Sequence, residues 1–327
     1  MIEVSSLSKR YGNFLAVDDV SFSIKKGEVV GFLGPNGAGK STIMNIVTGY
    51  LSLTQGTVTV DGYDILEEPE QAKRRIGYLP EIPPLYTDMT VYEYLAFVYD
   101  LKKVKFPKKP HIDEILRLVK IDNVKNKLIS KLSKGYRQRV GIAQALVGNP
   151  DVLILDEPTV GLDPKQIIEI RNLIARLGQN HTVIVSSHIL SEIQAVCERV
   201  IIINHGKIVA DSTPDELSRE LSNDHSVVLR VAGTEDELTK ILSNVKGVQS
   251  VNCLGQKESG TLDFVVTPKA GADIRREISE RLASRNKYVV MLASNQLSLE
   301  QVFMRLTYEA DAAAITAAAK NGKVGEK

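Results

Sequence analysis

The sequence has 327 residues, of which 43% are hydrophobic and 25% charged, so the chain can bury a core and is not expected to be disordered. Its 41 Lys and Arg residues balance its 40 Asp and Glu residues, which gives no electrostatic reason to expect general binding to nucleic acid. Two cysteines cannot form a disulfide framework, and the sequence shows neither an apolar signal segment nor an apolar run of about 18 residues. We therefore expect a cytoplasmic protein of one large or two smaller domains.

Short apolar and alternating segments predict strands over the first part of the chain. The expected strands cover residues 2–4, 20–24, 29–33, 56–62, 151–155, 182–186 and 200–203. Helices are expected at 90–104 and 111–121, where Pro107 and Pro110 separate the two. Apolar strands that alternate with helices predict an α/β domain with a mostly parallel sheet.

The pattern changes near residue 222. Beyond it, strands are expected at 227–231, 248–254, 261–266 and 288–292, and helices at 235–242 and 273–283. The order β-α-β-β-α-β is that of a ferredoxin-like α+β unit. The predicted limits are 1–222 for the α/β domain, 223–308 for an accessory domain that ends in a helix at 298–306, and 309–327 for a flexible tail rich in Ala and Lys.

A glycine-rich segment between an expected strand and an expected helix fits the phosphate-binding pattern G-x-x-x-x-G-K-[ST]. The predicted nucleotide-binding residues are Gly34, Pro35, Asn36, Gly37, Ala38, Gly39, Lys40, Ser41 and Thr42. Glycines let backbone N–H groups turn toward phosphate oxygens, Lys40 is expected at the β- and γ-phosphates, and the Ser41 hydroxyl is expected to ligate Mg²⁺. Kinases, GTPases and motor ATPases all carry this loop, so other residues must decide between them.

Two adjacent carboxylates and a histidine follow the next apolar strands. Asp156 and Glu157 come directly after the run at 152–155, and His188 follows the strand at 182–186. At the tip of its strand, Asp156 can hold Mg²⁺ directly or through water. Glu157 can act as the general base that polarises the attacking water, and His188 is expected to contact the γ-phosphate.

Further segments resemble the nucleotide-binding subunits of ABC transporters, and the resemblance covers about residues 1–220. The segment from Leu132 to Tyr136 resembles the family signature, Gly161-Leu162-Asp163 resembles the D-loop, and Glu81 stands in a segment similar to the Q-loop. The resemblance implies a P-loop fold of ABC type, with a mixed sheet core and a helical signature subdomain. It further implies ATP hydrolysis, stacking of Tyr11 on adenine, and a D-loop role for Asp163.

Two motifs depart from the usual family pattern. Glu81 replaces the Q-loop glutamine, and the signature reads Leu-Ser-Lys-Gly-Tyr, with Lys134 and Tyr136 at the changed positions. A carboxylate at position 81 can still approach Mg²⁺, and Lys134 adds a cation that can favour the γ-phosphate. Both departures resemble a bacterial exporter branch that includes sodium, drug and gliding-motility (GldA-like) ATPases.

The resemblance also implies partners. In this family, the signature residues Ser133, Lys134, Gly135 and Tyr136 complete the nucleotide site of a second subunit, which implies a dimer, here a homodimer, with two ATP at its interface. A transmembrane permease subunit is expected to contact the apolar segment from Glu81 to Tyr94, which would hold the chain at the inner face of the cell membrane. No nucleic acid partner is expected.

The alternative is a soluble ABC ATPase with a regulatory or nucleic-acid-linked role. DNA-repair members carry long coiled-coil insertions between the P-loop and the signature. In this chain, prolines at 83, 84, 107 and 110 would interrupt the long helices of such an insertion. Translation factors resemble two fused cassettes, whereas this chain has one. A subunit with inactive catalysis is disfavoured by Glu157 and His188, and an importer subunit remains open.

Overall fold

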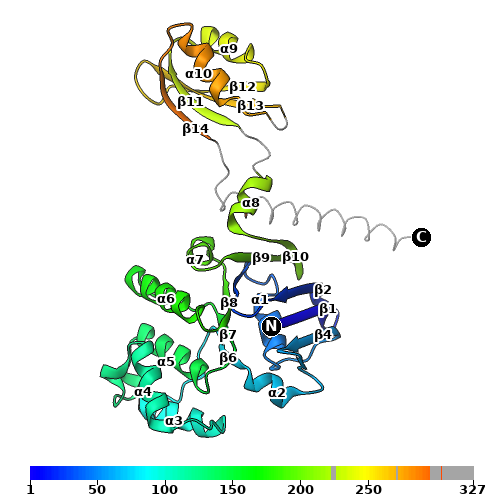
Figure 1. Cartoon of the computed structure of the whole chain (residues 1–327), viewed down its shortest axis with the longest axis vertical. Coiled ribbons are helices and arrows are strands. Elements are labelled where there is room, and N and C mark those ends of the chain that lie inside the picture. The colour runs from blue at the N-terminus through cyan, green and yellow to red at the C-terminus, as the bar shows by residue number, and fades with distance from the viewer. Residues whose placement is uncertain (222–225, 270–271, 295–302, 304–327) are drawn as a thin grey trace, which may run out of the picture. The chain divides into compact units, whose positions relative to one another are not determined.

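The computed structural model of the chain describes residues 1–221, 226–269, 272–294 and 303. The chain divides into two compact units, of which the first covers Met1–Pro214 and the second begins at Asp215 (Figure 1). The limits predicted at 222/223 and 308/309 stay predictions, and most of the helix expected at 298–306 and all of the tail at 309–327 lie outside the described residues. No helix of the described part is both long and apolar enough to cross a membrane.

A six-stranded sheet forms the centre of the first unit. Its five neighbouring strands β9, β3, β8, β7 and β6 run parallel, and β10 pairs antiparallel with β9 at the edge. In sheet order the strands are β10 (Lys207–Ser212), β9 (Arg199–Asn204), β3 (Val29–Leu33), β8 (Thr182–Ser187), β7 (Val152–Asp156) and β6 (Ile76–Leu79). Every residue of β3, β7 and β8 is buried, which confirms the prediction of a mostly parallel, buried sheet.

A second, antiparallel sheet packs on the first. Its order is β2 (Phe14–Ile24), β1 (Ile2–Tyr11), β4 (Gln55–Val60) and β5 (Tyr63–Asp64). The rings of Phe22 in β2 and Phe32 in β3 meet edge to face at 5.1 Å, so the two sheets share one core, which also holds the apolar face of α1 (Lys40–Val47). The strands predicted at 2–4 and 20–24 were too short. Hairpin pairing between β1 and β2 extends both strands over the more polar residues that lie between the two predicted ranges.

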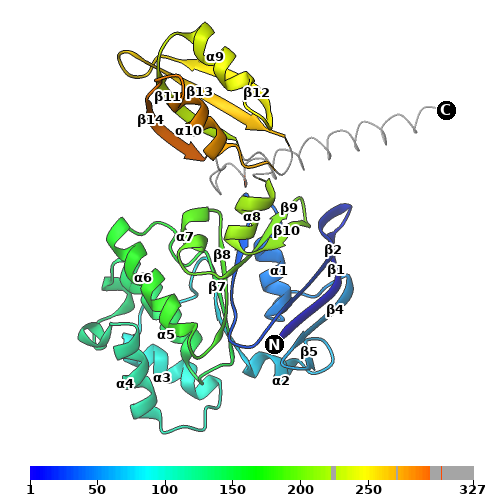
Figure 2. The same cartoon turned by 45° about the horizontal axis from the view of Figure 1, so that its top comes forward.

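Three helices of the first unit form a separate group at one end. Figures 1 and 2 show α3, α4 and α5 together, away from the antiparallel sheet. The helix bounds are α2 (Pro69–Arg74), α3 (Val91–Leu101), α4 (Lys108–Leu118), α5 (Lys134–Leu146), α6 (Pro164–Leu177) and α7 (Leu190–Gln194), with 3-10 turns at Asp122–Val124 and Ile129–Lys131. A further helix, α8 (Pro214–Leu221), begins where the second unit starts. The prediction that Pro110 precedes a helix was wrong: Pro110 lies within the first turn of α4, where a helix does not need the missing N–H.

The second unit has the predicted ferredoxin-like order. Its elements are β11 (Val227–Ala232), α9 (Glu235–Ser243), β12 (Val248–Gly255), β13 (Thr261–Pro268), α10 (Arg275–Ala283) and β14 (Val289–Ser294). The sheet order β12-β13-β11-β14 is antiparallel throughout. Leu229 and Phe264 of the sheet and Leu238 and Ile278 of the two helices share one fully buried core, so both helices cover the same face.

Candidate active site

The phosphate-binding loop connects β3 to α1, as the sequence pattern predicts. It follows Leu33 at the end of β3 and enters α1 at Lys40. Gly37 and Gly39 have φ angles of 81° and 108°, a region that favours glycine. A side-chain carbon at Gly39 would lie 2.9 Å from the Ala16 carbonyl oxygen. A glycine-rich turn that leads into a helix N-terminus can bind phosphate through its backbone N–H groups.

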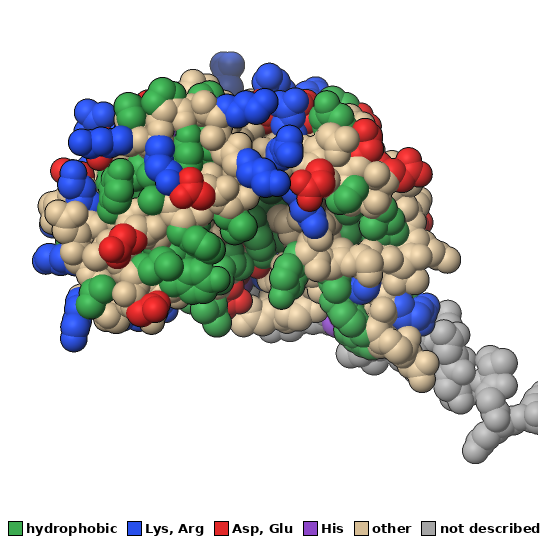
Figure 3. Space-filling model, turned by 90° about the horizontal axis from the view of Figure 1, so that it is seen from below, with side chains coloured by type: hydrophobic (Ala, Val, Ile, Leu, Met, Phe, Trp, Pro, Cys, Tyr) green, Lys and Arg blue, Asp and Glu red, His purple; other side chains and the backbone are tan. Residues whose placement is uncertain are grey.

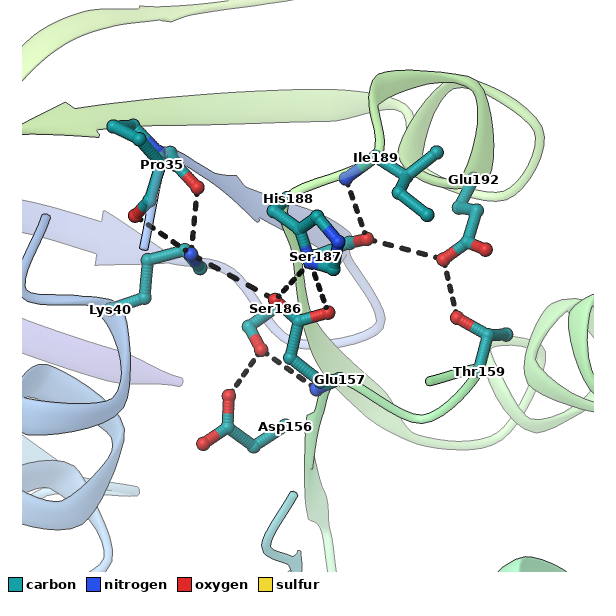
Figure 4. A network of polar contacts seen from close by, with 11 residues as sticks. Pro35, Lys40, Asp156, Glu157, Thr159, Ser186, Ser187, His188, Ile189 and Glu192 are labelled. Carbon is teal, nitrogen blue, oxygen red and sulfur yellow. Dashed lines mark hydrogen bonds and ion pairs between the residues drawn. The ribbon is translucent and has the colours of Figure 1, made fainter. Parts of the chain in front are cut away.

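Lys40 is buried at this loop. Its Nζ donates to the carbonyl oxygens of Gly34 at 2.7 Å and Pro35 at 3.2 Å, and it lies 3.8 Å from Oε1 of Glu157 (Figure 4). Burial lowers the pKa of Lys40, while the negative charges of Glu157, Asp156 and Glu81 act in the opposite direction. The ammonium is therefore held between the loop and the carboxylates, where it can neutralise a phosphate.

Three oxygen donors meet beside the loop. Ser41 in α1, Asp156 at the end of β7 and Glu81 after β6 line one cavity of about 600 Å³. Asp156 is 2% exposed, and the Ser186 hydroxyl donates a hydrogen bond to its Oδ1. A hydroxyl and two carboxylates are the hard oxygen ligands that Mg²⁺ prefers, so the donor set fits this ion.

Glu157 is a buried carboxylate in contact with His188. It is 6% exposed, and both of its carboxylate oxygens lie within 3.1 Å of Nδ1 of His188 (Figure 4). Burial raises the pKa of Glu157, and the hydrogen bond and charge of His188, followed by the charge of Lys40, oppose the rise. A carboxylate whose pKa is raised accepts a proton from water more readily, as a general base requires.

A cavity of about 640 Å³ joins most of the residues predicted to bind ATP. They come from the β1–β2 hairpin, the phosphate-binding loop, the Glu81 segment and the ends of β7 and β8. The lining residues are Tyr11, Phe14, Ala16, Asn36, Gly37, Gly39, Lys40, Ser41, Thr42, Glu81, Glu157, Val160 and His188.

Phe14 and Val160 were missed by sequence reasoning. Phe14 is 66% exposed and pairs with Tyr11 across the hairpin, so the two aromatic rings come from facing strands at the mouth of the cavity. The Gly12-Asn13 pair was an available signal for Phe14, because such a dipeptide is typical of a two-residue hairpin turn. Val160 gave no signal, since one valine after a strand has no chemistry of its own.

The signature residues lie elsewhere. Among the described residues that line the nucleotide cavity, none comes from α5, whose N-cap is Ser133. The Ser133 hydroxyl accepts weakly from the Tyr136 N–H at 3.4 Å. Lys134 lies over Gly161, since a side-chain carbon there would be 2.0 Å from the lysine Nζ.

The D-loop lies beside the signature. Asp163 caps α6 by accepting from the Gln166 N–H at 2.9 Å, and a side-chain carbon at Gly135 would lie 2.4 Å from the Gln166 side-chain oxygen. Signature and D-loop are thus neighbours on one surface, and the signature does not reach the nucleotide cavity of its own chain.

An apolar surface borders the cavity that holds Ser41, Glu81 and Asp156. Figure 3 shows hydrophobic side chains gathered around a hollow on the face seen from below. Tyr50 and Ile82, both 82% exposed, line this cavity together with Pro84. Tyr86 is half-exposed and contacts the ring of Phe97 at 5.4 Å. Exposed aromatic and aliphatic side chains around a hollow suit a protein contact.

Comparisons with known proteins agree with this geometry. Residues 17–160 match the model of the ABC transporter family. The chain is 40% identical over 221 residues to the bacitracin transport ATP-binding protein BcrA of Bacillus licheniformis, which covers 67% of this chain and 72% of that protein. It is 33% identical over 314 residues to the linearmycin resistance ATP-binding protein LnrL of Bacillus subtilis (strain 168), which covers 94% and 98%. A dimeric ATP-binding cassette solved in a post-hydrolysis state with ADP and Pi has a TM-score of 0.60 at 27% identity, covering 65% of this chain and 98% of that one.

Proposed function

The chain belongs to the family of ABC transporter ATP-binding subunits and is an ATPase; from this premise we propose that it drives a membrane exporter by ATP-dependent closure of a dimer. One observation carries the proposal: the nucleotide cavity and the signature surface occupy different places in one chain. A γ-phosphate bound in the cavity needs hydrogen-bond donors on the side that faces away from the phosphate-binding loop. The donor groups of the signature need an anion to bind. Two chains related by a two-fold axis satisfy both needs.

The main groups of the site have separate roles in this proposal. The loop and Lys40 bind the β- and γ-phosphates, and Tyr11 and Phe14 hold the adenine. Ser41, Asp156 and Glu81 would hold Mg²⁺, which neutralises charge on the phosphate oxygens when bound. Glu157 orients the attacking water and accepts its proton.

The histidine and the partner chain complete the site. His188 lies at the carboxyl end of β8 and contacts the γ-phosphate, while its Nδ1 is held by Glu157. From the second chain, the Ser133 hydroxyl, the Gly135 N–H and the N-terminus of α5 contact the same phosphate, with Lys134 adding positive charge. Because this phosphate bridges the two chains, its loss on hydrolysis opens the dimer.

Export rather than import is supported by the relatives. BcrA is named for bacitracin transport and LnrL for linearmycin resistance, and the LnrL alignment covers 94% of this chain, so it extends into the second unit. Glu81 and the Lys134–Tyr136 pattern support a place in the branch with sodium, drug and gliding-motility ATPases. The accessory domain predicted at 223–308 is proposed to support the dimer or regulate it.

The apolar surface around Tyr50, Ile82 and Pro84 is proposed to receive a transmembrane permease. This contact would hold the chain at the cytoplasmic face of the membrane. The surface borders the cavity that contains Glu81, so a movement of the permease can displace the proposed metal ligands.

A pull-down from detergent-solubilised membranes tests the proposal. The tagged chain should retain a polytopic membrane protein and hydrolyse ATP in that complex. Lys40→Ala should retain the same membrane protein without hydrolysis. Recovery of the chain without a membrane protein, or with nucleic acid that a nuclease releases, would favour the non-transport alternative.

A further inference from the structure

A buried carboxylate outside the nucleotide cavity has no part in the scheme above. Glu192 in α7 is 6% exposed. Its Oε2 accepts a hydrogen bond from the Thr159 hydroxyl and another from the Ser187 hydroxyl at 3.2 Å (Figure 4). Burying a carboxylate costs free energy unless hydrogen bonds compensate for the lost water. The two hydroxyls that donate to one oxygen of Glu192 provide this compensation, so they hold the carboxylate in a defined position.

The two hydroxyls belong to the two segments that carry the reacting groups. Thr159 stands two residues after Glu157 and begins the turn that leads to Asp163. Ser187 directly precedes His188, and its hydroxyl accepts from the Ile189 N–H at 3.0 Å. Glu192 therefore ties the segment after β7 to the end of β8, directly before His188, on the side away from Lys40 (Figure 4).

The segment after β7 needs such support, because Glu157 has a φ angle of 47°. A non-glycine residue in this left-handed region is strained and keeps the conformation only where its surroundings hold it. On one side the Glu157 N–H donates to the Ser186 hydroxyl at 2.9 Å. On the other side the contact from Thr159 to Glu192 holds the chain two residues later.

We propose that Glu192 is a positioning residue that fixes Glu157 against His188 and makes the D-loop segment and the His188 segment move as one body. Glu192 acts through its two hydroxyl partners and does not contact the nucleotide. The inference rests on the proposed roles of Glu157 and His188. It adds the means by which the D-loop, at the signature surface, is coupled to the γ-phosphate side of the cavity.

Matched substitutions at Thr159 test the inference by steady-state hydrolysis. Thr159→Val removes the hydroxyl and keeps the shape, so kcat should fall at least tenfold while the KM for ATP stays within about twofold. Thr159→Ser keeps the hydroxyl and should recover at least half of the wild-type kcat. Thr182→Val is the control: this buried hydroxyl accepts from the Gly27 N–H at 2.9 Å at the other end of β8, so its loss should lower Tm without lowering kcat.

Substitutions at Glu192 separate its hydrogen bonds from its charge. Glu192→Gln keeps an oxygen that can accept from both hydroxyls, so kcat should stay within about threefold of wild type. Glu192→Ala should behave like Thr159→Val. In a His188→Ala background, Thr159→Val should have little further effect on kcat, because both changes remove the same arrangement.

Three results would overturn the inference: an unchanged kcat for Thr159→Val, an equal fall for Thr182→Val, or full additivity with His188→Ala. Should Glu192→Ala fail to fold, the Thr159 series still decides. If wild type and Thr182→Val hydrolyse ATP and Thr159→Val does so equally well, this inference fails and the proposed function stands. If the wild type does not hydrolyse ATP at all, the proposed function itself fails.

Discussion

Gly39 and Gly37 provide a direct test of how the phosphate-binding loop is held. Both have positive φ angles, 108° and 81°. A side-chain carbon at Gly37 would meet nothing within 4 Å, whereas one at Gly39 would lie 2.9 Å from the Ala16 carbonyl oxygen. Substitution of alanine therefore imposes backbone strain at both positions and a clash with a backbone atom at one.

The magnitudes follow from these two terms. A left-handed conformation costs an alanine about 1–2 kcal/mol, and alanine recovers about 0.4–1 kcal/mol by restricting the unfolded chain. We therefore expect Gly37→Ala to lower the free energy of unfolding by about 1 kcal/mol. Gly39→Ala adds the displacement of the Ala16 backbone, which by analogy with overpacking costs about 1–3 kcal/mol more. In a domain of this size each kcal/mol lowers Tm by about 2–4 °C.

Thermal unfolding without nucleotide measures this difference, and fluorescence titration with an ATP analogue measures binding. Gly39→Ala should have a Tm clearly below that of Gly37→Ala and should bind nucleotide at least tenfold more weakly than wild type. Equal Tm values for the two variants would refute the reasoning, because they would mean that the Ala16 carbonyl does not confine Gly39.

Further predictions concern titration and the apolar surface. Burial raises the pKa of Glu157, so its protonated form stabilises the fold, and this stability is lost as pH rises through the raised value. In calorimetric scans, Glu157→Gln should therefore gain stability relative to wild type as pH rises above the ordinary glutamate pKa of about 4.3. Hydrogen bonds from the Thr90 backbone and hydroxyl lower the pKa of Glu93, so its ionised form stabilises the fold above the ordinary glutamate pKa, and this stability is lost as pH falls through the lowered value. Glu93→Gln should therefore be less stable than wild type at neutral pH, with a difference that shrinks in acid, and the same sign for both variants at neutral pH would contradict this account. Leu85→Asp or Tyr86→Ala should leave ATP binding within twofold of wild type and reduce recovery of the permease in pull-downs, whereas unchanged recovery would count against the proposed contact.

Much of the site could be predicted because it lies in continuous segments. The phosphate-binding loop and the pair Asp156-Glu157 each follow an apolar strand directly, so local pattern places them at the same edge of a parallel sheet. The strand β3, the helix α1 and the β-α-β-β-α-β order of the second unit are confirmed for the same reason.

What could not be predicted depends on pairing between distant segments. The edge strand β10 is held by hydrogen bonds to β9 and has no buried residue, only half-buried and exposed ones, so its apolar pattern is weak. Phe14 enters the cavity only through its register with Tyr11. Glu192 is 33 residues from Thr159, and a glutamate on a short helix gives no sequence signal that two hydroxyls will surround it.

The central claim, that one phosphate bridges two chains, is tested most directly by light scattering after size-exclusion chromatography of Glu157→Gln. With ATP and Mg²⁺ the variant should elute as a dimer, and without nucleotide as a monomer. The double variant Ser133→Arg/Glu157→Gln should bind ATP and remain a monomer, because the arginine side chain would fill the space of the phosphate donor on the signature surface. A dimer formed by the double variant in ATP, or a nucleotide-loaded Glu157→Gln that stays monomeric, would contradict the account.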